Sequence, residues 1–593
     1  MKKILLFLYA AAVSLCVTSC ADFLDTENLV KKNTSNCPTN EDEVNELLTG
    51  AYAPLWQLFG ATHPYLMDNM LSGDCLGGGG ASDTSLPIFF HRYQNTTDYT
   101  NSWTKLYMGI YRCNMLLNSL DLIEWEDNNS RKIIEGEAYY LRGMYYYFMA
   151  VTFGTVPIVT TPEPQNNPKA SSDEMFKLIL SDLGKAIELL PSEVQPVSEM
   201  GHATRWAAQA LQARAYLFYD GYYKNNQRQD VALREGTLTK TNVVSGLEDC
   251  IKNSGYSLLG EFRNQWPYAV DIPEADYKYA KDNKLRWVGE EGANTETVFA
   301  VKYSSTAGWA SPNAPYLGNS FALFLGFRGM TLMNFGGGYG MCGVNTNMWN
   351  EWSDNDIRKR GSVLDIYDTE NEGVPVDGIN VPAGESGFRL GGWEAMQETG
   401  YFIKKYFPVN VRMTNSSGNK VICNYSCPLY GREPNYQLDN TQDWVVIRFA
   451  DVLLMHSELS QTTDGINKVR ARVGLEPIAA YTDEALRNER RWELAFEGLR
   501  YQDMMRWYGQ DAGKEIQKTL RGCKIYNNAM ATTIDGTPLA SNAFDAKCKQ
   551  YFEDIDKRYR ETGGFMQIPN NEILLSNGVL VQNKGWETSA AAF

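Results

Sequence analysis

The sequence predicts a mainly α-helical fold, in which a tetratricopeptide-like helix-turn-helix scaffold is interrupted by a loop-rich insertion with short strands. Three observations lead to this class. Apolar residues recur at helical spacing up to residue 260 and again after residue 441. Residues 261–440 are instead rich in Gly, Asn, Pro and aromatic residues. Small side chains also line one face of a predicted helix, opposite larger ones.

Five helices are expected before the insertion. They cover residues 39–58, 102–123, 131–154, 171–191 and 202–223. Gly154 ends the third helix, and the fourth is expected to begin with Ser172 or Asp173 as its cap and to stop at Pro191. In the fifth, four alanines lie about one turn apart and allow a neighbouring helix to approach closely: Ala203, Ala207, Ala210 and Ala213.

The chain is expected to divide into four parts. Residues 1–19 form a leader, residues 20–260 the first helical scaffold, residues 261–440 the insertion that bears the ligand face, and residues 441–593 the closing helices with an irregular tail. After the insertion, helices are expected in VVIRFADVLLMHSEL, in DGINKVRARVGL and in RRWELAFEGLRYQDMMRW.

The first twenty residues have the pattern of a bacterial lipoprotein signal. Lys2 and Lys3 precede an apolar run from Ile4 to Val17, which is too short for a comfortable membrane span. The run ends in VTSC, where a small residue before Cys20 matches a lipobox. Cleavage would leave Cys20 acylated, and lipid alone would anchor the chain. The alternative is an ordinary signal peptide that contains cysteines.

Composition excludes one class of partner. The net charge of −16 would repel nucleic-acid phosphates over most of the surface, so no nucleic acid is expected. The 12% of aromatic residues could fill a core or form flat binding surfaces, and composition does not separate the two.

The cysteines point to no metal site. Of 11 cysteines, Cys16 leaves with the leader and Cys20 takes the lipid, which leaves nine, an odd number with at least one free thiol. Cys423 and Cys427 are four apart, which is not the spacing of a CxxC pair, and a local disulfide between them is left open in an oxidising compartment. With four histidines in the chain, no metal-ligand cluster stands out.

The sequence gives little support for a catalytic function. Glu493 and Glu497 would share a helix face, but the surrounding arginines favour their ionised forms, so an ion-paired scaffold is the better interpretation than a glycosidase acid pair. No GxSxG elbow is present, and the glycine runs lack a following GK[ST]. We therefore expect no catalytic residue, no cofactor and no metal.

The aromatic residues of the insertion favour a binding function. Seven lie in or beside its loops: Trp266, Trp287, Trp309, Tyr316, Trp349, Trp352 and Trp393. Exposed aromatic faces stack on the apolar faces of sugar rings, while polar neighbours bond the hydroxyl groups. The alternative for each is a core anchor that holds its loop.

Several motifs together resemble one family. They are CADFLD at the lipid site, GEAYYLRGMYYYFMAVTFGTVPIV, ATRWAAQALQARAYLF, RFADVLLMHSEL, INKVRARVGL, ERRWELAFEGLRYQDMMRW and QIPNNEILLSNGVLVQNKGW. Over essentially its whole length the chain resembles the SusD/RagB family of outer-membrane lipoproteins of Bacteroidetes.

The resemblance implies a lipid-anchored protein at the outer membrane that faces the cell exterior. It implies a partner, a SusC-like TonB-dependent transporter, and no catalysis. Ligand residues cannot be carried over by motif, so the following are expected on physical grounds alone: Trp309, Trp266, Tyr316, Trp287, Asp74 and Arg92.

Two functional hypotheses follow. The first is a glycan-binding protein that captures oligo- or polysaccharide for import, which the tryptophans in loops favour. The second is a RagB-like oligopeptide-binding protein of a peptide importer, in which the pocket would contact peptide backbone. An enzyme is the least favoured alternative.

Overall fold

The computed structural model describes most of the chain. The described residues are 37–58, 60, 62–80, 83, 99–194, 200–289, 294–310, 314–390, 395–407, 409–524 and 554–586. The expected leader, the lipid site at Cys20, and the predicted residues Arg92 and Trp393 lie outside them.

The fold is mainly helical and tetratricopeptide-like, as predicted, with few short strands. The helices are α2 (Glu41–Trp56), α3 (Pro64–Leu71), α4 (Thr100–Ser119), α5 (Asn128–Phe153), α6 (Ser172–Leu189), α7 (Arg205–Phe218), α8 (Lys240–Asn253), α9 (Lys278–Asp282), α10 (Ser320–Leu325), α11 (Thr346–Glu351), α12 (Ile357–Ser362), α13 (Thr369–Glu372), α14 (Ser426–Tyr430), α15 (Phe449–Ser460), α16 (Asp464–Arg472), α17 (Asp483–Glu493), α18 (Arg500–Tyr508), α19 (Ala512–Leu520), α21 (Ile555–Thr562) and α22 (Asn570–Leu575). The strands are β1 (Val231–Ala232), β2 (Thr237–Leu238), β3 (Thr297–Val301), β4 (Asn334–Phe335), β5 (Val363–Asp365), β6 (Tyr401–Ile403), β7 (Val409–Thr414), β8 (Lys420–Asn424) and β9 (Trp444–Arg448).

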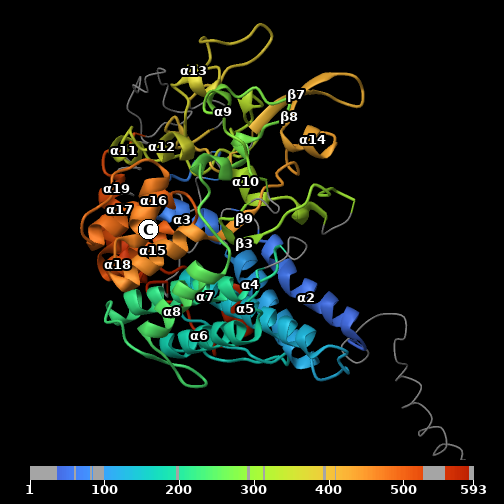
Figure 1. Ribbon diagram of the computed structural model, residues 1–593, viewed down its shortest axis with the longest axis vertical. Helices are drawn as coiled ribbons and strands as arrows, with labels where there is room; N and C mark the ends of the chain where they lie inside the picture. Colours follow the sequence, from blue (N-terminus) through green and yellow to red (C-terminus); the bar gives the residue numbers. More distant parts are fainter. Residues whose placement is uncertain are drawn as a thin grey trace, which may run out of the picture.

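The helices form two groups that meet at a small strand pair. Figure 1 shows α2 and α4 to α8 in the lower half, α15 to α19 at the left, and the short elements between α9 and α14 at the top. Strands β3 and β9 pair antiparallel near the centre of the view. Two further antiparallel units, β4-β7-β8 and β5-β6, lie within the insertion.

Helix α5 is the core of the first group. It packs against α2, α4, α6 and α7, and all its residues from Tyr140 to Phe153 are buried. A helix that is covered on every side needs apolar or paired side chains all round, which explains the run of Tyr, Met and Phe in this segment. Gly154 ends the helix with a positive φ of 73°, as the sequence predicts.

Gly109 and one buried ion pair determine how the neighbouring helices α4 and α6 pack against α5. Gly109 of α4 lies directly against the ring of Tyr145, so that a Cβ at residue 109 would come 2.3 Å from the ring. Nearly one turn before Tyr145, Arg142 forms two hydrogen bonds of 2.7 and 2.8 Å with Asp182 of α6. The close approach of α4 and the buried ion pair with α6 therefore fix how these three helices pack together.

The structure corrects one detail of the predicted helices, the cap of α6, and agrees with another, the small side chains of α7. The cap of α6 is Ser171, one residue before the expected positions, because its side chain and that of Glu174 bond each other's backbone N–H in a capping box. In α7 the alanines Ala207, Ala210 and Ala213 are fully buried.

The segment RRWELAFEGLRYQDMMRW was expected to be one helix, and this expectation is wrong. Helix α17 ends at Glu493, and α18 begins at Arg500. Between them Phe496 and Gly498 adopt φ values of 64° and 72°, which no α-helix continues. Glu493 and Glu497 therefore do not share a helix face, although both bind Arg448.

Glu493 and Glu497 are buried and ion-paired, as expected, but their partners are distant in sequence and are not the neighbouring arginines Arg490, Arg491 and Arg500. Glu493 accepts hydrogen bonds from Arg448 at 2.6 Å, from Arg358 at 3.0 Å and from Arg472. Glu296, which directly precedes β3, binds both Arg448 and Arg472. We call Glu493, Glu296, Arg358, Arg448 and Arg472 the ionic hub. Burial alone would raise the pKa of Glu493, but the arginines hold it well below its usual value.

A second ion-pair chain continues from the hub into the helical body. Asp451 of α15 binds Arg214 of α7 at 2.6 Å and Arg490 at 2.7 Å. Arg490 in turn binds Asp503 of α18, and Arg506 joins Asp503 to Glu458. These pairs connect the two groups of helices through the interior.

The tail after residue 509 was expected to be irregular, and the structure corrects this in part. Its described residues contain α19, α21 and α22, which are short helices of six to nine residues. Among all described residues, no helix is long and apolar enough to cross a membrane.

The contact between α4 and α5 predicts opposite effects for two glycine substitutions. Gly109→Ala forces a methyl group into the Tyr145 ring and should lower the free energy of unfolding by about 1–3 kcal/mol. Gly50→Ala is the control, because no atom lies within 4 Å of a Cβ there and α2 should gain about 0.5–1 kcal/mol. Urea unfolding measures both, and equal effects at the two positions would contradict the packing described.

The buried charges predict loss of stability in acid. Paired arginines lower the pKa of Asp451 and of Glu458 to about 2 despite their burial, and burial lowers the pKa of His63 to about 3. Each group binds protons more tightly when unfolded, so the stability it contributes is lost as pH falls. Burial raises the pKa of Asp68 to about 7, which acts in the opposite direction. Between about pH 6 and pH 4 the effects of His63 and Asp68 oppose each other and nearly cancel. The free energy of unfolding should therefore fall mainly between about pH 4 and pH 2, where Asp451 and Glu458 are protonated more readily in the unfolded chain; a flat profile over this range would contradict the prediction.

Candidate functional site

The β3-β9 pair places two long loops at one edge. Val301, the last residue of β3, pairs with Trp444, the first residue of β9. Because the strands are antiparallel, the chain that leaves β3 and the chain that enters β9 emerge side by side. Lys302 and Asp443 close this edge with an ion pair of 2.6 Å.

Hydrogen bonds hold the two loops together beyond the strands. Arg432 donates to the carbonyl oxygens of Ser305 at 2.8 Å and Ala307 at 3.2 Å. Asn319 donates through its backbone to the carbonyl of Asn440 at 2.7 Å, which ties the segment after η7 (Ala314–Leu317) to the same loop. These contacts fix the position of residues 302–310 and 314–319 relative to residues 431–443.

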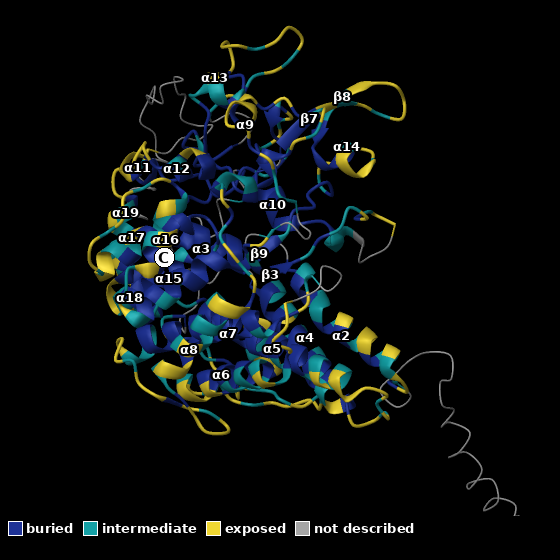
Figure 2. Cartoon of the chain, in the orientation of Figure 1, coloured by how far each residue is buried: buried dark blue, intermediate teal, exposed yellow. Residues whose placement is uncertain are grey.

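Exposed aromatic side chains lie on these two loops and at the end of α14. Trp309 is 62% exposed, Tyr436 is 55% exposed and Tyr430 is 42% exposed, while Tyr316 is half-buried. We call these four residues the aromatic patch. Figure 2 shows α14 and the loop that follows β3 on the same side of the molecule, each with both buried and exposed residues.

The patch has polar neighbours that could bond hydroxyl groups. Gln437, beside Tyr436, donates a hydrogen bond to the Tyr339 hydroxyl at 3.3 Å, and Ser304 and Thr306 precede Trp309 with their hydroxyl groups 2.8 Å apart. Flat aromatic faces edged by amides and hydroxyls suit a ligand with both an apolar face and hydroxyl groups.

The expected ligand residues that the structure describes lie in different parts of the fold. Trp309 and Tyr316 both lie between Ser304 and Leu317, which are joined by a hydrogen bond of 2.7 Å from Ser304 N–H to Leu317 C=O. Trp287 is half-buried and lies edge-on to the ring of Tyr425, which directly precedes α14. Arg92 lies outside the described residues.

Trp266 and Asp74 lie in the interior. Trp266 is 1% exposed, and its ring packs against Tyr406 and beneath the ammonium group of Lys405, so no ring face is open to a ligand. Asp74 is buried and binds Arg491 at 2.7 Å. Both side chains hold the scaffold in the structure, which argues against ligand contact.

Sequence reasoning missed Tyr430, Tyr436 and Arg432. All three follow β8 within a segment, SCPLYGREPNYQ, whose Gly, Pro and Asn predict a turn. Tyrosines in such a turn were the available signal, but most of the predicted aromatic ligand residues were tryptophans.

Two concave features lie elsewhere among the described residues. A groove of about 630 Å³ has an apolar floor that includes Tyr277 and Leu285, with Lys281, Lys284 and Arg286 among its other lining residues. Tyr277 is buried, so this groove lacks an exposed aromatic face of the kind that the patch offers.

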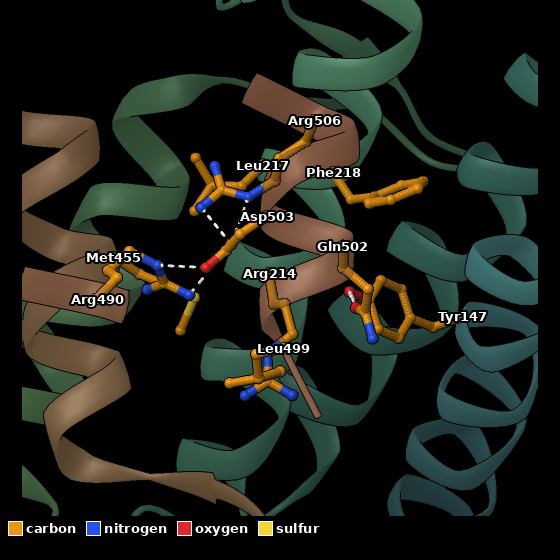
Figure 3. A pocket seen from close by; sticks show the side chains of 10 residues that line it. All are labelled: Tyr147, Arg214, Leu217, Phe218, Met455, Arg490, Leu499, Gln502, Asp503 and Arg506. Atoms are coloured by element: carbon orange, nitrogen blue, oxygen red, sulfur yellow. Dashed lines mark hydrogen bonds and ion pairs between the residues drawn. The ribbon is translucent and has the colours of Figure 1, made fainter. Parts of the chain in front are cut away.

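The second feature is a closed cavity in the helical body, which Figure 3 shows from close by. Its volume of about 10 Å³ is that of roughly one water molecule. Arg214, Arg490 and Asp503 line it and belong to the ion-pair chain described above. It is a packing defect of the scaffold and not a ligand site.

Comparison with protein families gives two matches. A model described as "Starch-binding associating with outer membrane" matches residues 22–217, and a model described as "SusD family" matches residues 344–586. The chain belongs to the SusD/RagB family. Membership confirms the prediction that the chain is not an enzyme, because proteins of this family bind their ligands without catalysis.

Individual relatives agree with this membership. The "SusD-like protein P25" of Formosa agariphila is 24% identical over 452 residues, which are 69% of this chain and 70% of the relative. The "SusD-like protein" of Bacteroides ovatus is 22% identical over 498 residues, which are 78% of this chain and 76% of the relative.

Solved structures share the fold at low identity. A "Laminarin binding SusD-like protein" superposes with a TM-score of 0.64 at 22% identity, over 92% of this chain and 99% of that one. Surface glycan-binding protein A of Bacteroides thetaiotaomicron, solved in complex with laminarihexaose, gives a TM-score of 0.65 at 19% identity, over 92% of this chain and all of that one.

The role of Arg432 predicts a local effect. Arg432→Met removes both hydrogen bonds to the loop that carries Trp309, so amide exchange in residues 303–310 should accelerate at least about tenfold, since a hydrogen bond from a charged donor contributes about 1.5–3 kcal/mol. Arg412→Met is the control, because Arg412 is half exposed and pairs with Glu385 on the surface. Hydrogen exchange followed by mass spectrometry measures both variants, and unchanged exchange in residues 303–310 would contradict this role.

Proposed function

We propose that the chain is a cell-surface glycan-binding lipoprotein that captures oligo- or polysaccharide and delivers it to a SusC-like TonB-dependent transporter. The observation that carries the proposal is the exposure of Trp309 on a loop that Arg432 ties to the segment bearing Tyr430 and Tyr436. Exposing such rings to water is unfavourable unless a ligand covers them, and the apolar face of a sugar ring is a suitable cover.

The family match and the named relatives support this ligand class. One family model is described as starch-binding, and two structural neighbours are named for laminarin or bound laminarihexaose. The match to a family described as associated with the outer membrane supports a surface location, and the lipobox at Cys20 supports lipid attachment there. The transporter partner follows from the family alone.

The peptide-binding alternative is less favoured. A site for extended peptide would offer unpaired backbone groups along a strand edge or groove to the ligand backbone. The patch instead offers ring faces, while hydrogen bonds within the loops satisfy backbone groups such as the carbonyls of Ser305 and Ala307.

Binding should depend on Trp309. Native gels that contain laminarin and a panel of other plant, microbial and host glycans should retard the chain from Ala21 onward, and Trp309→Ala should weaken binding to the active glycan at least about tenfold, as loss of a central tryptophan does in binding sites. Tyr111→Ala is the matched control, since Tyr111 is a 48% exposed ring on α4 of the helical body.

The outcomes separate the hypotheses. Retardation by one glycan that Trp309→Ala removes and Tyr111→Ala leaves would establish the patch as the glycan site. Retardation that survives Trp309→Ala would refute the patch. No retardation by any glycan, together with peptides that co-purify with the protein, would favour oligopeptide capture.

A further inference from the structure

Two cysteine side chains meet at the base of the aromatic patch. Cys423 is near the end of β8, and Cys427 is in the first turn of α14, four residues later. Both are free thiols, and they lie close enough for each to shift the pKa of the other. Both side chains are buried, so neither thiol is in contact with bulk water.

The backbone on both sides of the pair is fixed. Cys423 pairs with Val411 of β7, and the following Tyr425 N–H donates to the carbonyl of Val409 at 2.8 Å. After this turn the hydroxyl of Ser426 donates to the carbonyl of Asp439 at 2.6 Å. The strand register and the helix start therefore hold the two sulfur atoms beside each other in the folded chain.

We propose that Cys423 and Cys427 are joined by a disulfide bond in the exported protein. The leader pattern directs the chain out of the cytoplasm, where thiol pairs in contact become oxidised. The bond would close a ring of the three residues between them and would fasten α14, which carries Tyr430, to the end of β8. The proposal does not depend on the ligand of the patch.

The chemistry is thiol–disulfide exchange with a protein disulfide oxidant of the export compartment. Before the turn is packed, the Cys423 thiolate attacks one sulfur of the oxidant's disulfide, which forms a mixed disulfide and releases one oxidant thiolate. The Cys427 thiolate then attacks the Cys423 sulfur and releases the second oxidant thiolate. Two protein thiols lose two protons and two electrons, and the oxidant's disulfide becomes a dithiol that takes up both.

The surroundings tolerate the loss of the thiol hydrogens. Cys427 donates at 3.3 Å to Asp439 Oδ2, an oxygen that also accepts the backbone N–H of Asn435 at 2.7 Å. Arg432 lies 3.4 Å from the other carboxylate oxygen of Asp439. Asp439 thus keeps two partners after oxidation, and the turn that holds the patch stays intact.

One tryptic peptide tests the proposal, because Val421–Arg432 contains both cysteines. Full-length protein is extracted from membranes in detergent, blocked with N-ethylmaleimide under denaturing conditions without reductant, and digested. The expected peptide carries no label, is lighter than its reduced form by two hydrogen atoms, and takes up two labels after reduction. One or two labels before reduction would overturn the proposal.

Two controls make the result specific. The peptide Thr241–Lys252 contains Cys250, a buried thiol beside Ser254, and should be labelled without reduction. In Cys423→Ser the peptide 421–432 should take up one label without reduction, which shows that Cys427 is reachable once its partner is gone. Absence of that label would mean that Cys427 bonds elsewhere and would also overturn the proposal.

Discussion

The buried carboxylate of Glu493 is the contact on which the remaining structure depends. Three arginines from separate parts of the chain reach it: Arg358 from α12 in the insertion, Arg448 from β9 and Arg472 from α16. Removing these charges from water costs several kcal/mol for each ion, and only mutual pairing offsets that cost. The ionic hub therefore requires the insertion and the helical body to be assembled together.

The hub also determines where the aromatic patch lies. Arg448 is the last residue of β9 and pairs with Thr297, which follows the hub residue Glu296. The ionic contacts thus clamp one end of the β3-β9 pair, and the loops that carry the patch leave from the other end. A binding surface built on loops gains its fixed geometry from this buried support.

The sequence predicted the helical body well because its periodicity and stop signals are local, as Gly154 at the end of α5 illustrates. The site was predicted only in part. Trp309 and Trp266 occur in similar loop-rich segments, but Trp266 is buried against Tyr406, a residue 140 positions away. Such burial depends on long-range packing that no local pattern contains. The break at Phe496 was missed for the same reason, since its positive φ serves contacts of α17 and α18 with distant elements.

The measurement that tests the account most directly is hydrogen exchange of the intact chain with and without a bound oligosaccharide. The account predicts that binding slows exchange in residues 303–317 and 430–438, the loops of the aromatic patch, and leaves the groove at residues 270–286 unchanged. Slower exchange in the groove, with none in the patch loops, would contradict the claim that the patch is where this protein holds its ligand.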